Sequence, residues 1–134
     1  MELKLIKKWF KYNHPEWVFI YHLVRLEIQL SLLDVKIFFS PRQRKLSKYY
    51  QSRSNIKLHI ACGKNIKKGW LNVDLGPSAD FQFNLRRKFP LKSSSVKYIF
   101  TEHFLDHLQR PEPIRHVLLE CCRVLKKGGV MRIL

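Results

Sequence analysis

Residues 56–74 read IKLHIACGKNIKKGWLNVD, and this stretch indicates the fold more clearly than any other. A short apolar run, Ile56–Ala61, is followed by the pair Cys62–Gly63, and a second run, Trp70–Val73, ends in Asp74. Short apolar runs that stop at polar residues or glycine are typical of buried strands. Polar residues therefore follow two predicted strands, and in open α/β sheets ligands bind at this end of the strands.

The same pattern continues toward the C-terminus. Further apolar runs are Phe81–Phe83, followed by Asn84; Val96–Phe100, followed by Thr101, Glu102 and His103; and Val130–Leu134. Between the last two, residues 112–125 place apolar side chains at helical spacing, and Gly128–Gly129 is a helix-stop signal. Strands that alternate with a helix and loops predict an α/β sheet.

The connection between the first two predicted strands is short. Only eight residues, Cys62 to Gly69, separate the two apolar runs. A parallel crossover usually needs about a dozen residues or more, whereas a hairpin needs only a few. On spacing alone, a hairpin is the simpler prediction here.

Several motifs occur in a characteristic order: LHIACG at 58–63, GWLNVD at 69–74, SVKYIFTEHFLDHL at 95–108 and LLECCRVLKKGGVMRI at 118–133. Together they resemble class I S-adenosylmethionine-dependent methyltransferases of the type 11 branch, over residues 57–133. The resemblance implies parallel first strands joined by a helix of about one turn. It also implies S-adenosyl-L-methionine as cofactor. Because the family sheet usually has seven strands, we expect an incomplete, C-terminally truncated Rossmann-like sheet of about five mostly parallel strands, preceded by an α-helical N-terminal segment.

The resemblance assigns cofactor-binding roles to the residues after the first two strands. The turn with Ala61 and Gly63 would pass the methionine part of the cofactor, and Gly63 allows a positive φ there. Ala61 stands where the family has its first glycine, and His59 stands where many members carry an acid. Asp74 is expected to accept hydrogen bonds from both ribose hydroxyls, since a carboxylate at a strand end does so in dinucleotide-binding folds.

Three further cofactor contacts are expected after later strands. Asn84 is interpreted either as an adenine ligand or as a turn-forming residue. Glu102 and His103 would lie beside cofactor and substrate. Together with Asp106 and His107 they spell E-H-x-x-D-H, which lacks the order and the third ligand of a zinc site, so we expect no metal. No catalytic residue is assigned, because methyl transfer to a good nucleophile needs mainly positioning and desolvation.

Composition narrows the class of protein. The chain has 134 residues, of which 46% are hydrophobic, and a formal net charge of +16. This excess suits a polyanion, but it is spread along the chain without a basic tail, so no specific nucleic acid is expected. The three cysteines, Cys62, Cys121 and Cys122, form neither a disulfide framework nor a zinc ribbon. With no signal peptide, a cytoplasmic location is expected.

Residues 1–55 show none of these motifs and are predicted as a basic helical segment, separate from a methyltransferase domain at 56–134. Residues 3–12 fit a short amphipathic helix, and residues 16–39 a long helix. Arg25, Glu27, Asp34 and Lys36 make the long helix too polar to span a bilayer. Because apolar residues alternate over 26–32, a strand is an alternative prediction there. Residues 42–54 fit a linker or a second short helix.

Two functions of different classes follow from these observations. The first is an S-adenosylmethionine-dependent methyltransferase that acts on a small-molecule or glycan-type acceptor; a resemblance to enzymes of cell-surface polysaccharide pathways points to a sugar. The second is a non-catalytic, truncated methyltransferase-like module. It would dock on a partner protein or a membrane surface through residues 1–39. The apolar positions of the helix over residues 16–39 cover more than one stripe and need a covering surface.

Overall fold

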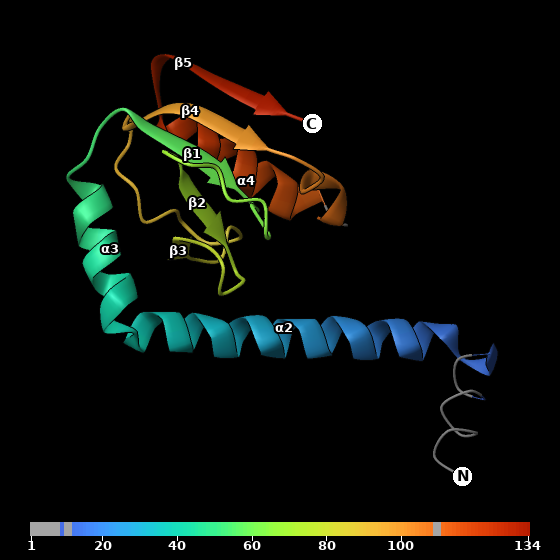
Figure 1. Cartoon of the computed structure of the whole chain (residues 1–134). Helices are drawn as coiled ribbons and strands as arrows, with labels where there is room; N and C mark the ends of the chain where they lie inside the picture. Colours follow the sequence, from blue (N-terminus) through green and yellow to red (C-terminus); the bar gives the residue numbers. More distant parts are fainter. Residues whose placement is uncertain (1–8, 10–11, 109–110) are drawn as a thin grey trace. The chain divides into compact units, whose positions relative to one another are not determined.

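The computed structural model describes residue 9 and residues 12–108 and 111–134 (Figure 1). The predicted helix over residues 3–12 lies largely outside this part. The chain divides into two compact units, one that ends at Val35 and one that runs from Lys36 to Leu134. The domain boundary expected after residue 55 therefore falls inside the second unit, and as a domain boundary it stays a prediction.

Helix α2 spans Pro15–Phe39, as expected from the sequence, so the strand alternative over residues 26–32 was wrong. Pro15 fits the first helical position, where its missing N–H costs nothing. None of the residues of α2 is buried. Among the described residues, no helix has the length and apolarity that a membrane span requires.

The second unit contains a five-stranded, fully parallel sheet, which confirms the predicted α/β, incomplete Rossmann-like fold. The strands lie in the order β3-β2-β1-β4-β5. Their bounds are Ile56–Ile60 for β1, Leu71–Asp74 for β2, Phe81–Gln82 for β3, Val96–Thr101 for β4 and Leu125–Ile133 for β5. Because β1 and β2 pair in parallel, the hairpin alternative was wrong.

Residues 61–70 connect β1 to β2 without a helix, in place of the helical turn that the family resemblance implied. Two turns shape the connection: the Asn65 N–H donates to the carbonyl of Cys62 at 2.8 Å, and the Trp70 N–H donates to that of Lys67 at 3.2 Å. Ten extended residues reach about 33 Å, about twice the length of a five-residue strand. The short strands are what allow so short a parallel crossover.

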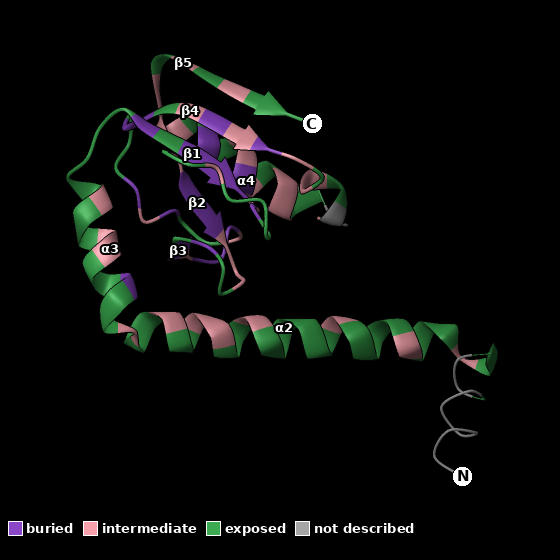
Figure 2. Ribbon diagram, in the orientation of Figure 1, coloured by how far each residue is buried: buried purple, intermediate pink, exposed green. Residues whose placement is uncertain are grey.

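One helix covers the core on one face of the sheet. Helix α4, Pro111–Val124, follows the short 3-10 helix η1, Leu105–His107. The buried apolar side chains of α4 belong to the same core as those of β1 and β4. Figure 2 colours the buried segments of these elements purple. They are Val117, Cys121 and Val124, together with Leu58, Ile60 and Ile99.

Helix α3, Pro41–Gln51, closes the β3 edge of the sheet. Ser40 caps its N-terminus, where the hydroxyl accepts a hydrogen bond from the Gln43 N–H. The buried Gln43 side chain in turn accepts the N–H of Gln82 in β3 at 3.1 Å, and the ring of Tyr50 stacks on that of Phe81. An edge strand exposes unpaired backbone groups, so this amide supplies the partner that a further strand would give.

Strand β5 begins five residues earlier than the sequence predicted, at Leu125 rather than Val130. Its register against β4 jumps from Leu125 opposite Val96 to Val130 opposite Tyr98. Residues 126–129 are therefore looped out of the ladder, and Gly128 takes a φ of 74°. The glycines that signalled the end of the helix accommodate this irregularity, so strand and turn share the same residues.

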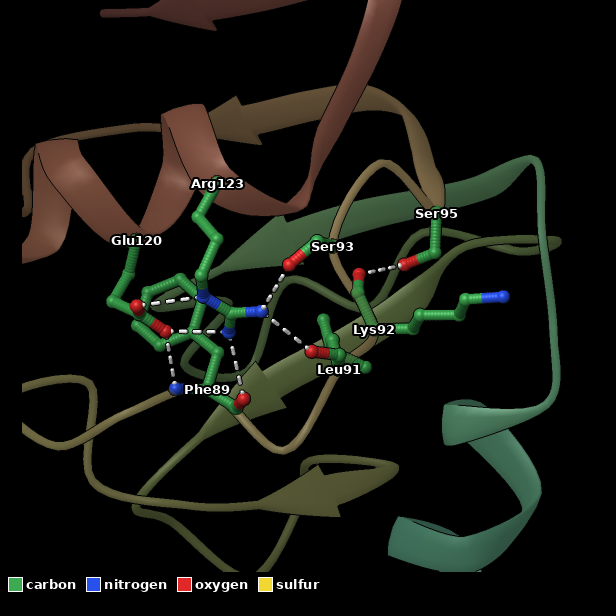
Figure 3. Close-up of polar contacts among 7 residues, drawn as sticks. All are labelled: Phe89, Leu91, Lys92, Ser93, Ser95, Glu120 and Arg123. Atoms are coloured by element: carbon green, nitrogen blue, oxygen red, sulfur yellow. Dashed lines mark hydrogen bonds and ion pairs between the residues drawn. The ribbon is translucent and has the colours of Figure 1, made fainter.

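An ion pair fixes the long loop between β3 and β4 to α4 (Figure 3). Glu120 and Arg123 lie one helical turn apart, with the Arg123 Nη2 2.6 Å from Oε2 of Glu120. The same carboxylate accepts the Phe89 N–H at 2.7 Å, and the guanidinium donates to the carbonyls of Phe89 and Leu91 and to the Ser93 hydroxyl. These hydrogen bonds lower the pKa of Glu120 below its ordinary value of 4.5, with the one from Arg123 as the largest cause.

Candidate functional site

The expected cofactor-binding residues all lie at or just after strand ends, at one edge of the sheet. From β1 the chain proceeds to β2 and β3 on one side, whereas β4 and β5 lie on the other. The order therefore reverses between β1 and β4, and in open α/β sheets ligands bind outside the strand ends at such a switch point. The expected residues at or just after the carboxyl ends of the parallel strands are Ala61, Gly63, Asp74, Asn84, Glu102 and His103.

The turn after β1 has an unusual backbone. Ala61 and Gly63 both take a φ of 54°, and the intervening Cys62 N–H donates to the carbonyl of Val73 at 3.1 Å. A Cβ built on Gly63 would meet no atom within 4 Å, so the space beside this turn is open. Glycine tolerates the left-handed region, whereas a side chain costs about 1–2 kcal/mol there, so Ala61 is strained.

Asp74 holds this turn in place from the end of the neighbouring strand. Its Oδ2 accepts the Gly63 N–H at 2.9 Å, and its Oδ1 accepts the Gly76 N–H at 2.9 Å. A carboxylate has about four acceptor positions, so capacity for about two further donors is left. Sequence reasoning missed Gly76, although a glycine two residues beyond a strand-end carboxylate is a recognisable turn signal.

Asn72, also missed, organises the return from β1 to β2. Its buried Nδ2 donates to the carbonyls of Lys67 and Trp70 and to Asp80 Oδ2, at 3.1, 3.2 and 2.7 Å. Its Oδ1 accepts the Lys67 N–H at 2.9 Å and lies 3.1 Å from Nδ1 of His59. Because that oxygen is an acceptor, His59 donates from Nδ1. The one polar residue inside an apolar run was the available signal.

His59 is a buried, neutral residue of the sheet. Burial is the main cause that lowers its pKa, and the hydrogen bond with Asn72 opposes this shift only in part. Its ring lies 5.2 Å from that of Phe100 in β4, and the Lys67 ammonium lies 4.4 Å from the same Phe100 ring. The histidine at the family's acidic position thus joins β1, β2 and β4.

The Cys62 thiol does not act as a nucleophile in this environment. Burial first, and the charge of Asp74 second, raise its pKa to about 11. The reactive form of cysteine is the thiolate, which this pKa leaves nearly absent at neutral pH. The polar chemistry of the turn is therefore carried by backbone N–H groups and by the carboxylate of Asp74.

The remaining expected residues lie at the same edge but are less closely tied to the turn. Asn84 is buried, and its Oδ1 and its carbonyl accept the N–H groups of Arg86 and Arg87, at 3.0 and 2.9 Å. This is the turn-forming geometry; its role at an adenine stays a prediction. Glu102 is half-buried, whereas His103 is exposed with a φ of 50° and donates its N–H to the carbonyl of Leu134.

The E-H-x-x-D-H motif lies at the start of the connection from β4 to α4. Residues 105–107 form η1, so the motif is not on a regular α-helix, and the His107 side chain lies outside what is described. Within the described part of the chain, no three His, Cys, Asp or Glu residues are grouped so that they could hold a metal ion.

Comparison with known proteins places this fold in a family. A family model described as a methyltransferase domain matches residues 62–133, which begins in the turn after β1 and ends in β5. No curated protein matches the sequence. The matched range includes Gly63, Asp74, Asn84, Glu102 and His103 and leaves out Ala61. Since the match covers more than half of the chain, this protein belongs to the methyltransferase domain family, whose members generally use S-adenosylmethionine.

Proposed function

We propose that this chain binds S-adenosyl-L-methionine at the carboxyl edge of the sheet and methylates a small-molecule or glycan-type acceptor. One observation carries the proposal: Asp74, at the end of β2, is hydrogen-bonded to the N–H of Gly63 in the open turn after β1. The site thus has two parts. One is a turn with positive φ angles and open space beside it, and the other is a carboxylate that can accept further hydrogen bonds. These features fit an adenosyl ligand with ribose hydroxyls.

In this proposal each residue has a binding or positioning role. Asp74 accepts the ribose hydroxyls, and the turn from Ala61 to Gly63 borders the methionine part. When bound, S-adenosyl-L-methionine would supply an electrophilic methyl group, carried on a sulfonium, for transfer to the acceptor. Glu102 and His103, beyond β4, would border the acceptor. A carboxylate or phenolate acceptor needs no base, whereas a sugar hydroxyl must lose a proton to solvent or to a nearby group.

The test is calorimetric titration of the full chain with S-adenosylhomocysteine. A matched pair of variants locates the site: Gly63→Leu and Gly69→Leu. Both glycines have a positive φ, 54° and 78°, and open space at the Cβ position, so both variants carry the same kind of strain. Only Gly63 lies beside Asp74 at the carboxyl edge.

We expect the wild-type chain to bind one equivalent, Gly69→Leu to bind with the same affinity, and Gly63→Leu to bind at least about tenfold more weakly, because its side chain fills the ligand space. A folded wild-type chain that gives no heat would refute cofactor binding. Equal weakening in both variants would place the ligand elsewhere.

The second candidate is a non-catalytic module that docks on a partner or membrane surface through residues 1–39. It is supported by α2, which buries no residue and exposes large apolar side chains along its length. These include Trp17, Phe19, Tyr21, Ile28 and Leu32. Absence of binding in the titration would favour this candidate. In both cases we propose a cytoplasmic setting, which keeps the three free cysteines reduced.

A further inference from the structure

Helix α3 has two faces of different chemistry. Gln43, Leu46 and Tyr50 follow at spacings of three and four residues, so they share one face, and this face packs on β3 and the core. Arg44, Lys45 and Lys48 come between them in the sequence and are exposed, as the largely green helix in Figure 2 shows. The sheet thus fixes the helix with its cations toward solvent.

Acidic residues are absent from this region of the sequence. Between Asp34 and Asp74 the sequence has ten Lys or Arg residues and no Asp or Glu. Six of them lie between the last turn of α2 and residue 53, just beyond the end of α3, and among the described residues no carboxylate forms an ion pair with these six. They are Lys36, Arg42, Arg44, Lys45, Lys48 and Arg53. Clusters of about four to eight cations on such a helix are typical of binding to anionic lipid headgroups.

Exposed aromatic rings accompany these cations. Phe38 and Phe39 are 71% and 68% exposed, their ring centroids are 5.3 Å apart, and only Ser40 separates them from α3. Tyr49 is also exposed and has the guanidinium of Arg53 4.4 Å from its ring centroid. Aromatic rings beside cations suit the boundary between headgroups and acyl chains of a bilayer.

We propose that α3, together with Phe38 and Phe39, forms a contact surface for an anionic lipid bilayer. The cations would lie among phosphate and carboxylate headgroups, while the phenylalanine rings enter the acyl boundary. A nucleic acid would supply the phosphates, but a duplex offers no apolar phase for two adjacent exposed phenylalanines. The surface lies mainly on α3, beyond the docking segment 1–39, and it does not depend on cofactor binding.

The experiment is flotation of the full chain with vesicles of phosphatidylcholine, with and without phosphatidylserine. The test variant is Arg44→Gln/Lys45→Gln/Lys48→Gln. The matched control, Lys57→Gln/Lys92→Gln/Lys97→Gln, removes the same net charge at exposed positions outside α3. We expect binding only to vesicles that contain phosphatidylserine. The α3 variant should bind about a hundredfold more weakly, since each of its three lost cations contributes about fivefold, whereas the control should change little.

Two further measurements complete the test. Phe38→Ser/Phe39→Ser should weaken vesicle binding while its sensitivity to salt persists, because the cations remain. A short RNA duplex should not displace the wild-type chain from the vesicles. Equal weakening by the two triple-glutamine variants, binding to pure phosphatidylcholine, no effect of the Phe variant, or displacement by the RNA would each overturn the proposal.

Discussion

The Glu120–Arg123 pair and the Asp74 carboxylate both fasten a loop, but they differ in how much bonding capacity they leave. Arg123 uses all five of its N–H groups, on Glu120, Phe89, Leu91 and Ser93. Asp74 accepts two backbone N–H groups and keeps room for more, beside an open turn. A polar cluster whose capacity is used internally stabilises the fold, whereas one with spare capacity at a strand end is suited to bind a ligand.

The largest effect is expected from removing Arg123. Arg123→Ala leaves the Glu120 carboxylate poorly paired in a mostly buried position, where its side chain is 11% exposed. Breaking a buried pair costs about 3–5 kcal/mol, and we expect about 3 kcal/mol because Arg123 itself is a quarter exposed. Urea denaturation followed by circular dichroism measures this loss in the free energy of unfolding.

The exposed Arg115 of the same helix supplies the control, since Arg115→Ala removes an equal charge without breaking the Glu120–Arg123 pair. A loss in Arg123→Ala no larger than in this control would show that the cluster contributes little stability. The contrast drawn above, in which the Glu120–Arg123 pair stabilises the fold and Asp74 is suited to bind a ligand, would then be wrong for the pair.

Removing the Asp74 carboxylate should act on binding. Asp74→Ala is expected to weaken S-adenosylhomocysteine binding by about 1–3 kcal/mol, the cost of hydrogen bonds to a charged group left unmade. Because Asp74 also holds Gly63 and Gly76, Asp74→Asn is the milder variant: it keeps one acceptor oxygen, for one of these two N–H groups, and should loosen the turn less than Asp74→Ala. Glu27→Ala in α2 removes the same charge outside the sheet. Unchanged affinity in a folded Asp74→Ala protein would refute the ribose role.

Lowering the pH should destabilise the protein through the Glu120–Arg123 pair less than removing Arg123 does. The folded-state pKa of Glu120 lies below 4.5, its ordinary value, so the carboxylate contributes stability in full above that value. The contribution falls as pH drops below 4.5 through the folded pKa, because the unfolded state binds more protons there. Thermal melts from about pH 3 to 7 should show a steeper acid loss for wild type than for Glu120→Gln. Parallel curves would contradict this assignment.

The contrast between these two polar clusters also shows which features the sequence alone can predict. The apolar runs and the polar residues that end them predicted all five strands of the sheet and the position of Asp74. Both signals depend only on residues that are neighbours in the sequence. The parallel pairing of β1 with β2 needed the family motifs, since spacing alone favoured a hairpin. The roles of Asn72, Gly76 and Gln43 depend on partners that only the folded chain brings close, such as Asp80 or Gln82. Likewise, the start of β5 depends on its register with β4.

The smallest effect, and the one that tests strain at the site, is expected from Ala61→Gly. Ala61 has a φ of 54°, which costs about 1–2 kcal/mol relative to glycine, while glycine adds about 0.5–1 kcal/mol of unfolded-state entropy. The variant should therefore be more stable by up to about 1.5 kcal/mol. Ala79→Gly is the control, because Ala79 is buried and not among the positive-φ residues, so it should be destabilised.

If the turn at Ala61 is strained in order to border a ligand, the stabilised Ala61→Gly variant should bind S-adenosylhomocysteine no more tightly than wild type, because the more flexible backbone must be ordered on binding. Chemical denaturation and calorimetry of the two alanine variants give both quantities. A destabilised Ala61→Gly protein would show that the methyl group of Ala61, which packs partly against the core, outweighs the backbone strain.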